Sequence, residues 1–324
     1  MRRSLARLGV RLAAALAILG ATALPAAAQQ THLLVIVGVG GSPDHVKRFH
    51  GYGTTIVDSA VKGGLPEAQI TYLADKPEEA PAADARSTRE NVSKALSDLA
   101  AGSGANDEIF IVLIGHGTFD GQQGAFNLGG PDLTAADYAT LLGAFKTQRI
   151  VFVNTASSSG AFLSALAGPA RTIVTATRTG GERNETRFAE HFAAAWNTES
   201  ADSDRNGRIS VQEAFEYARL NVEASYKQTG HIPTEHPTLD DGSDGKLAST
   251  QYLTPPRSRS GEMASADPKL QKLVAQQDEL QQQIDRHRLM KDRMDAAQYE
   301  AELERLLTEL ALVSRTIRDM EGAR

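Results

Sequence analysis

The sequence predicts an α/β fold in which a mostly parallel β-sheet lies between two layers of helices. Short runs rich in Val and Ile recur along the first half of the chain, at 33–39, 70–73, 109–114, 150–153 and 172–176. Their length and composition are typical of strands that are buried on both faces. Segments with helical periodicity separate or follow them, near 44–62, 88–101, 134–145, 160–167 and 186–197. This alternation predicts a three-layer sandwich.

The start of the second helix carries a capping motif. Ser87 is followed three residues later by Glu90, which is the spacing of a capping box. In such a box the serine hydroxyl accepts a hydrogen bond from the backbone N–H of the third residue. We therefore expect Ser87 to cap this helix.

The first 28 residues have the order of a secretory signal peptide. Four arginines within residues 2–11 precede the apolar run 12–24, and the alanines at 26–28 provide a cleavage site. The apolar run is shorter than the roughly 20 residues that a membrane-spanning helix needs. We therefore expect cleavage after Ala28, a periplasmic or secreted mature protein, and no membrane span after cleavage.

Charge and cysteine content limit the partners and the chemistry. The chain has 34 Lys and Arg against 40 Asp and Glu, a net charge of -6; removal of residues 1–28 takes away four arginines and no acid, which gives -10. An acidic surface disfavours nucleic acid and anionic membranes as partners and is compatible with divalent cations. The chain has no cysteine. It therefore forms no disulfide and has no thiol chemistry, so an apolar core must hold the fold.

The composition changes after residue 250, where we place a domain boundary. Residues 254–261 are rich in Pro, Arg and Ser and lack periodicity, which predicts a linker over 251–267 after a domain of residues 29–250. The following segment, 268–321, carries apolar residues at alternating spacings of four and three, namely Tyr299, Leu303, Leu306, Leu310, Val313, Ile317 and Met320. A weaker series precedes it, at Leu270, Leu273, Leu280 and Ile284.

These spacings predict a coiled coil in the C-terminal segment. The two series are interrupted near residues 290–297, where Asp295 is placed to cap a second helix. We expect either an antiparallel helical hairpin or a long helix that dimerises. Its role is that of a stabilising or self-associating tail, or of a device that recruits a protein partner.

Residues suited to chemistry follow two strands of the predicted sheet. The run 109–114 ends at Gly-His-Gly, residues 115–117, and the run 150–153 leads to Ala-Ser-Ser-Ser-Gly, residues 156–160. Functional groups of open parallel sheets collect beyond the carboxyl ends of the strands. The glycines beside His116 permit close backbone approach. We therefore single out His116, Gly117 and Ser157.

The two motifs resemble the catalytic motifs of the caspase and legumain peptidases. In those peptidases a His-Gly after one strand supplies the base, and an Ala-Cys pair after the next, often continued as Ala-Cys-x-Ser-Gly, supplies the nucleophile. His116 and Gly117 are similar to the first motif and residues 156–160 to the second, about forty residues apart. The resemblance covers roughly residues 32–250. It implies a caspase-like sandwich with a peptide or protein ligand in the cleft.

The resemblance places Ser157 where those peptidases have the nucleophilic cysteine. In an active enzyme it implies Ser157 as nucleophile, His116 as base, and the N–H groups of Gly117 and Ser157 as oxyanion donors. A hydroxyl is far less acidic than a thiol and needs a hydrogen-bonded base that a third group orients. The sequence shows no evident third group, because Asp120 is equally suited to the turn at 119–121.

Three functions are compatible with these observations. The leading hypothesis is an exported, non-catalytic peptidase homologue that binds peptides or acts as a scaffold. The second is an active serine-dependent peptidase or other hydrolase that uses Ser157 and His116. The third is a coiled-coil interaction protein in which the globular domain is a calcium-stabilised platform.

Residues 202–213 match the calcium-binding loop of an EF-hand at every position. The expected ligands are the side chains of Asp202, Asp204, Asn206, Ser210 and Glu213 and the backbone carbonyl of Arg208. Gly207 permits the sharp turn, and helical patterns flank the loop on both sides. We therefore expect Ca²⁺ as a ligand, with a solvated acidic turn as the alternative.

Two further loops belong to the same predicted sheet edge. Residues 38–41 contain three glycines after the first strand, but they lack the third spaced glycine of a dinucleotide-binding loop. We interpret them as a tight strand-to-helix turn. Residues 177–184 follow the fifth strand and carry charged side chains, which either grip a peptide side chain or form a solvated turn.

Overall fold

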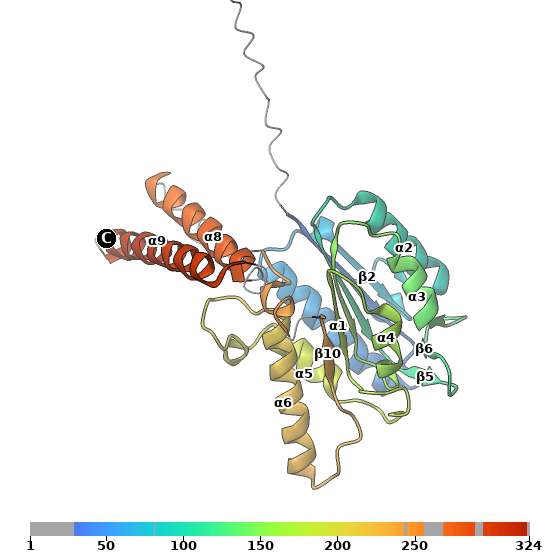
Figure 1. Ribbon diagram of the computed structural model, residues 1–324. Coiled ribbons are helices and arrows are strands. Elements are labelled where there is room, and N and C mark those ends of the chain that lie inside the picture. The colour runs from blue at the N-terminus through green and yellow to red at the C-terminus, as the bar shows by residue number, and fades with distance from the viewer. Residues whose placement is uncertain (1–28, 81, 243–244, 256–267, 289–293, 323–324) are drawn as a thin grey trace, which may run out of the picture.

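The computed structural model describes residues 29–80, 82–242, 245–255, 268–288 and 294–322. The predicted signal peptide and most of the predicted linker lie outside these residues. Figure 1 shows an α/β domain and, at the C-terminal end of the chain, two long helices.

A seven-stranded sheet forms the centre of the domain, in the order β10-β9-β8-β4-β1-β2-β3. Its strands are β1 (Thr31–Val37), β2 (Ile70–Ala74), β3 (Ala85–Arg86), β4 (Glu108–Ile114), β8 (Arg149–Asn154), β9 (Arg171–Thr175) and β10 (Thr238–Asp240). Neighbouring strands are parallel except for β10, which runs antiparallel to β9. The five strands expected from the sequence are thus confirmed as the parallel part of the sheet.

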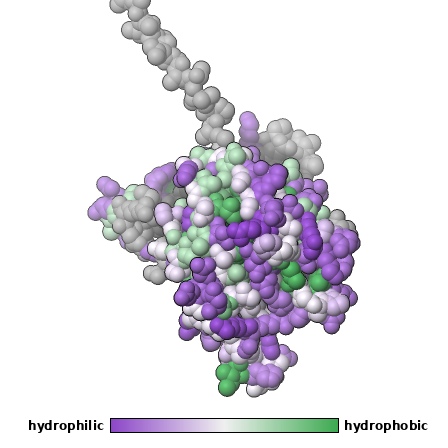
Figure 2. All heavy atoms as spheres, turned by 90° about the vertical axis from the view of Figure 1, so that its right-hand side faces the viewer, coloured by the Kyte–Doolittle hydropathy of each residue, from purple (hydrophilic) through white to green (hydrophobic). Residues whose placement is uncertain are grey.

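Helices cover both faces of the sheet (Figure 1). One layer contains α1 (Pro43–Lys62), α5 (Phe188–Ala195) and α6 (Val211–Thr229), and the other contains α2 (Arg89–Gly102), α3 (Ala135–Leu142) and α4 (Leu163–Leu166). Successive strand side chains point to opposite faces, so in β1 Val35 packs with the first layer and Ile36 with the second. The outer surface over α2 and α3 is mostly hydrophilic, with small separate hydrophobic patches (Figure 2). The predicted α/β sandwich is confirmed.

A small antiparallel sheet follows β4 and was not expected from the sequence. It consists of β5 (Gly117–Phe119), β6 (Gly124–Phe126) and β7 (Leu133–Thr134). Strands of two or three residues are too short to show an alternating pattern. Short 3-10 segments lie at Glu67–Gln69, Pro77–Glu79, Ser159–Phe162, Glu199–Ala201 and Ala248–Thr250.

The predicted cap of α2 is wrong by one residue. Thr88 is the N-cap, and its side chain accepts a hydrogen bond from the N–H of Asn91. Ser87 is fully buried and its hydroxyl donates to the carbonyl oxygen of Val37 at 2.6 Å. A buried hydroxyl needs a partner, and the end of β1 supplies one, which takes Ser87 away from the helix start.

The C-terminal helices α8 (Pro268–Arg288) and α9 (Ala296–Gly322) pack against each other. Gln277 donates to Ser314, and His287 lies beside Tyr299, so the two helices run antiparallel. Asp295 accepts hydrogen bonds from the N–H groups of residues 297 and 298, as its predicted capping role requires. Of the two expected arrangements the structure has the hairpin. Within the described residues no helix is both long and apolar enough to cross a membrane.

Candidate functional site

The sheet brings His116, Gly117 and Ser157 to one edge. Strands β4 and β8 are parallel neighbours, and His116 and Ser157 follow their carboxyl ends. The hydroxyl of Ser157 donates to the carbonyl oxygen of Gly117 at 3.0 Å and accepts from its N–H at 3.3 Å. Ser157 is only 6% exposed. The two predicted motifs therefore meet through backbone and hydroxyl groups.

The glycine at 117 is what permits this contact. A Cβ at this position would lie 2.4 Å from the carbonyl oxygen of Ser157, closer than non-bonded atoms allow. On the other strand, the Asn154 side chain accepts from the N–H of Ala156, and Ser158 takes a left-handed conformation with φ of 59°. This tight turn holds Ser157 against β5.

The imidazole of His116 is held by a group that the sequence did not reveal. Its Nε2 lies 3.3 Å from the carbonyl oxygen of Gly40, in the turn after β1. A carbonyl can only accept, so Nε2 carries the proton and Nδ1 is left as the basic nitrogen. A Cβ on residue 40 would lie 2.6 Å from the N–H nitrogen of Val46, so the turn needs glycine there. The glycine-rich run was the only available signal.

Two aromatic rings enclose His116 on the α1 side. His45 and Phe49 contact it edge-on, with ring centroids at 4.9 and 5.1 Å. Burial lowers the pKa of His116 below its usual value, and the neighbouring His45 lowers it further. His45 in turn lies 3.1 Å from a carboxylate oxygen of Glu185. The imidazole of His116 is therefore kept neutral, as a base must be.

Asp120 does not orient His116. Its carboxylate accepts hydrogen bonds from the N–H groups of Gln122 and Gln123, so it stabilises the turn between β5 and β6. Of the two roles open from the sequence, the turn is the one observed. Within the described part of the chain, no hydrogen bond joins His116 to Ser157.

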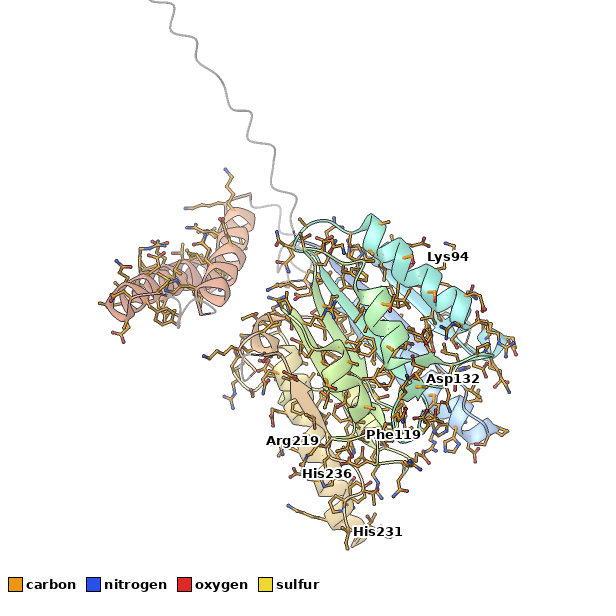
Figure 3. The ribbon with its side chains drawn as sticks, turned by 45° about the vertical axis from the view of Figure 1, so that its right-hand side comes forward. Lys94, Phe119, Asp132, Arg219, His231 and His236 are labelled. Atoms are coloured by element: carbon orange, nitrogen blue, oxygen red, sulfur yellow. The ribbon has the colours of Figure 1, made fainter. Side chains whose placement is uncertain are left out.

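Glu182 connects the Ser157 turn to a second surface. Its backbone carbonyl accepts from the N–H of Ser158 at 2.8 Å. Its carboxylate accepts from the N–H groups of Arg178 and His236 and lies 3.1 Å from Nδ1 of His236. Phe119 and His236 lie toward the same lower end of the domain in Figure 3. Glu182 thus ties the loop 177–184, most of whose residues are exposed, to this edge of the sheet.

Arg178 and His236 line a cavity of about 430 Å³ between the end of α6 and the strand that follows it. Apolar groups from Val222, Tyr226 and two prolines form part of its wall. Its acidic residues are engaged: Glu223 pairs with Arg219 at 2.7 Å, and Glu235 accepts from the N–H of residues 187 and 188. A concave, partly apolar site of this size suits a side chain of a bound peptide.

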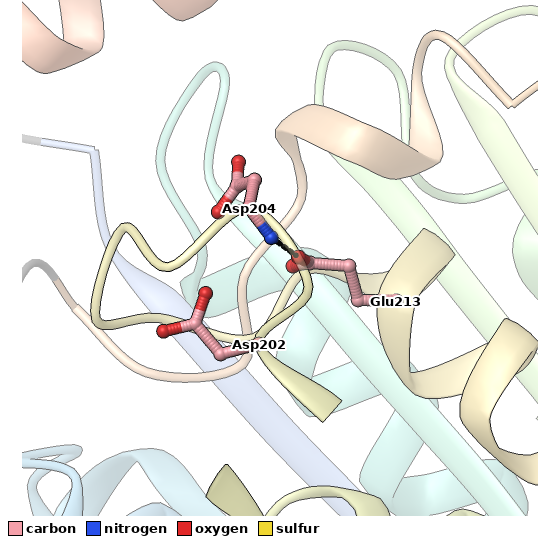
Figure 4. A group of neighbouring side chains, drawn as sticks. All are labelled: Asp202, Asp204 and Glu213. Atoms are coloured by element: carbon pink, nitrogen blue, oxygen red, sulfur yellow. Dashed lines mark hydrogen bonds between the residues drawn. The ribbon is translucent and has the colours of Figure 1, made fainter. Parts of the chain in front are cut away.

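The loop 202–213 brings its three predicted carboxylate ligands together. Single carboxylate oxygens of Asp202, Asp204 and Glu213 lie within 4.8 Å of one another (Figure 4). Burial, the charges of Glu213 and Asp202, and the hydrogen bond with Asp202 raise the pKa of Asp204, against the lowering effect of the Asn206 N–H. Gly207 has a φ of 84°, as the expected sharp turn requires.

Two of the other predicted ligands form hydrogen bonds within the loop. The Asn206 side chain accepts from the N–H of Arg208, and Ser210 is the N-cap of α6 and forms a capping box with Glu213. The sequence did not show that Glu213 also serves as a helix cap.

The fold and the paired His and Ser motifs at one sheet edge define an α/β domain of the caspase-like kind. Residues 88–238 match the model of the peptidase C13 family. The match runs from the cap of α2 to the start of β10 and includes His116, Gly117, Ser157 and the loop 202–213. Over these residues the chain is thus similar to the peptidase C13 family, as the motifs predicted.

Among solved structures, that of protein GSU0716 from Geobacter sulfurreducens is similar to this chain, with a TM-score of 0.45 and 13% sequence identity. The similarity covers 69% of this chain and 98% of that one. No curated protein matches the chain.

Proposed function

We propose that the protein is an exported, non-catalytic member of the peptidase C13 family that binds peptide segments at the edge formed by β4, β8 and β9. The observation that carries the proposal is that the Ser157 hydroxyl is hydrogen-bonded to both backbone groups of Gly117. By the resemblance of the motifs, this hydroxyl occupies the position of a catalytic thiol. Because its hydrogen points at a carbonyl oxygen, it is not shared with His116.

The chemistry of the two possible nucleophiles supports this proposal. A cysteine thiol ionises to a few per cent at neutral pH and reacts with help from a loosely placed histidine. A serine hydroxyl needs direct proton transfer to a base at hydrogen-bond distance. The chain has no cysteine that could substitute. The cavity that Arg178 and His236 line supports binding as the activity of this edge.

A serine-dependent hydrolase is the second candidate, and the Gly40 carbonyl is the observation that favours it. By fixing the proton on Nε2 of His116, this carbonyl supplies the orienting group that serine catalysis needs. Such an enzyme would need the Ser157 hydroxyl to leave Gly117 and to donate to Nδ1 of His116.

One set of variants separates these candidates. Purified wild type, His116→Ala, Ser157→Ala and Ser157→Cys are treated with a fluorophosphonate probe and with a peptide-substrate library, and peptide binding is measured on an array. We expect no labelling or turnover by wild type, peptide binding that survives in Ser157→Ala, and turnover in Ser157→Cys.

The control for the probe is Ser158→Ala, because the Ser158 hydroxyl is buried without a partner in the described part of the chain. Labelling of wild type and of this control that disappears in both Ser157→Ala and His116→Ala would establish the hydrolase and exclude the pseudopeptidase. Absence of both peptide binding and turnover would exclude both candidates.

We also propose that the loop 202–213 binds Ca²⁺ and that the ion stabilises the domain. Three converging carboxylates with a raised pKa at Asp204 support this proposal, because like charges held together favour a divalent cation. A thermal melt with and without Ca²⁺ tests it. An unchanged melting temperature at saturating Ca²⁺ would count against the site.

A further inference from the structure

The apolar residues of α9 that suggested self-association pack against α8 of the same chain. Leu306, Val313 and Ile317 of α9 pack with Leu280 and Ile284 of α8, and none of them is more than 8% exposed. This series is therefore not available to a second chain. Any partner of the hairpin must use another face.

A second apolar face lies on α9, away from α8. Leu307 and Leu312 are 43% and 60% exposed, although Leu306 beside them is 2% exposed. With Ala311 between them they line an open groove of about 710 Å³, to which Thr308 and three charged residues also contribute. A surface leucine pair on a helix whose core face is already filled is typical of a contact site.

The solvent-facing side of α9 is a different one. Arg305 forms ion pairs with Glu302 and Glu309, both at 2.6 Å. This network gives the helix a charged side, as expected for a face in water. The helix thus has three sides: a buried seam, a charged side, and the apolar groove.

Charges at the two ends of the groove indicate the occupant. Glu300 and Glu304 line its N-terminal end, and Arg315 lines its C-terminal end. The exposed Arg315 guanidinium also lies 3.8 Å from a carboxylate oxygen of Asp319 on the same helix, a surface pair that a facing Glu304 would share. Glu304 and Arg315 are eleven positions apart, about 17 Å along a helix. When two such grooves meet in opposite directions about a two-fold axis near residues 309–310, each Glu304 faces the Arg315 of the other copy. Leu307 and Leu312, which are about 140° apart around the helix, flank this charged pair on its two sides.

We propose that the α9 groove binds the same groove of a second copy of this chain, in antiparallel orientation, so that two hairpins form a four-helix bundle. The face is self-complementary in charge, as a two-fold interface requires. A parallel pairing would place Glu304 opposite Glu304 and is disfavoured by repulsion. The small side chain of Ala311 lets the two helices approach near the axis.

Light scattering after size-exclusion chromatography tests the proposal on the purified protein. We expect a dimer for wild type, a monomer for Leu312→Asp, and a dimer for Leu220→Asp, since Leu220 is 54% exposed but lies on α6. Circular dichroism checks that helix content is unchanged in each variant. A monomeric wild type, or a dimer that Leu312→Asp leaves intact, would overturn the proposal.

Charge reversal tests the orientation. Glu304→Arg and Arg315→Glu are each expected to weaken the dimer about tenfold, because every dimer contains the pair twice. The double variant is expected to recover the affinity, and a mixture of the two single variants to form heterodimers. No recovery in the double variant would contradict the antiparallel register.

The absence of native cysteine provides a second measurement. A cysteine introduced as Ala311→Cys lies near the axis and is expected to form an intermolecular disulfide, whereas Glu300→Cys lies far from it and is not. A parallel pair would crosslink at both positions. If Leu312→Asp lowers the melting temperature of the α/β domain without changing the mass, the groove is covered within the chain and the proposal fails.

Discussion

The imidazole Nε2 of His116 lies 3.3 Å from the carbonyl oxygen of Gly40, 76 positions earlier in the chain. The contact exists because β1 and β4 are parallel neighbours, so the turns after both strands meet at one edge. It makes the backbone after β1 part of the candidate site. No side chain was needed to orient the histidine, which explains why a search of the sequence for an acidic partner found none.

Replacement of Gly40 by alanine is expected to destabilise the protein and to disturb His116. The new Cβ would clash with the N–H of Val46, and the turn that carries the accepting carbonyl would have to shift. We expect a loss of about 1–3 kcal/mol in the free energy of unfolding, measured by denaturant titration. The matched control is Gly51→Ala in α1, where nothing lies within 4 Å of the added Cβ; it is expected to gain about 1 kcal/mol from helix propensity.

His116 is expected to titrate below the usual histidine range. Burial and the neighbouring His45 lower the pKa in the folded protein, so as pH falls through about 6.5 the unfolded chain takes up this proton before the folded one. The contribution of His116 to stability therefore decreases as pH falls in this window. Imidazole NMR titration measures the midpoint, and His45→Ala should raise it. A midpoint at or above 6.5 in wild type would contradict the buried arrangement.

Asp204→Asn separates ion binding from loop folding. In the folded protein burial and like charges raise the pKa of Asp204, so its charged form costs stability as pH rises through that pKa. Without Ca²⁺ at neutral pH, removal of the charge should leave the melting temperature equal or higher. With Ca²⁺, wild type should gain melting temperature and the variant should gain less. Equal gains in both would exclude Asp204 as a ligand.

The hairpin is expected to depend on its buried seam. Ile317→Ala removes a side chain that is 1% exposed and should cost about 2–5 kcal/mol in the unfolding of the hairpin, followed by far-ultraviolet circular dichroism. The neighbouring Thr316 is exposed, so Thr316→Ala should change stability by less than about 0.5 kcal/mol. Similar effects of both substitutions would contradict the packing of α9 on α8.

The sequence predicted most where side chains repeat with a period. Buried runs such as 109–114 are typical of strands in a parallel sheet. The apolar spacing from Tyr299 to Met320 is typical of helices that pack against each other, so both kinds of element were predicted. The short strands β5, β6 and β7 carry too few residues for a period. Ser87 and Thr88 are both good caps, and the choice between them depends on the Val37 carbonyl, which comes from another part of the chain.

In the candidate site, too, residues in local motifs were predicted, whereas contacts between distant parts of the chain were not. His116 and Ser157 were found because motifs mark them, and Gly117 because it adjoins one. Gly40 contributes its backbone carbonyl. Because every residue has a backbone carbonyl, the residue type does not indicate that Gly40 accepts a hydrogen bond from His116. Glu182 was one charged residue among several in the loop 177–184, and its contacts with Ser158 and His236 arise only when three loops fold together.

Glu213 holds the loop 202–213 in shape before any ion arrives. One carboxylate oxygen accepts from Ser203 and Asp204 at the start of the loop, and the other accepts from Ser210 at its end. The loop therefore loses most of its conformational entropy when the chain folds, and it would lose less on binding a cation. Binding is instead opposed by an enthalpy term, because a cation that uses both oxygens of Glu213 must compete with the hydrogen bonds that they already accept. Occupancy would then be an exchange of partners rather than a folding event.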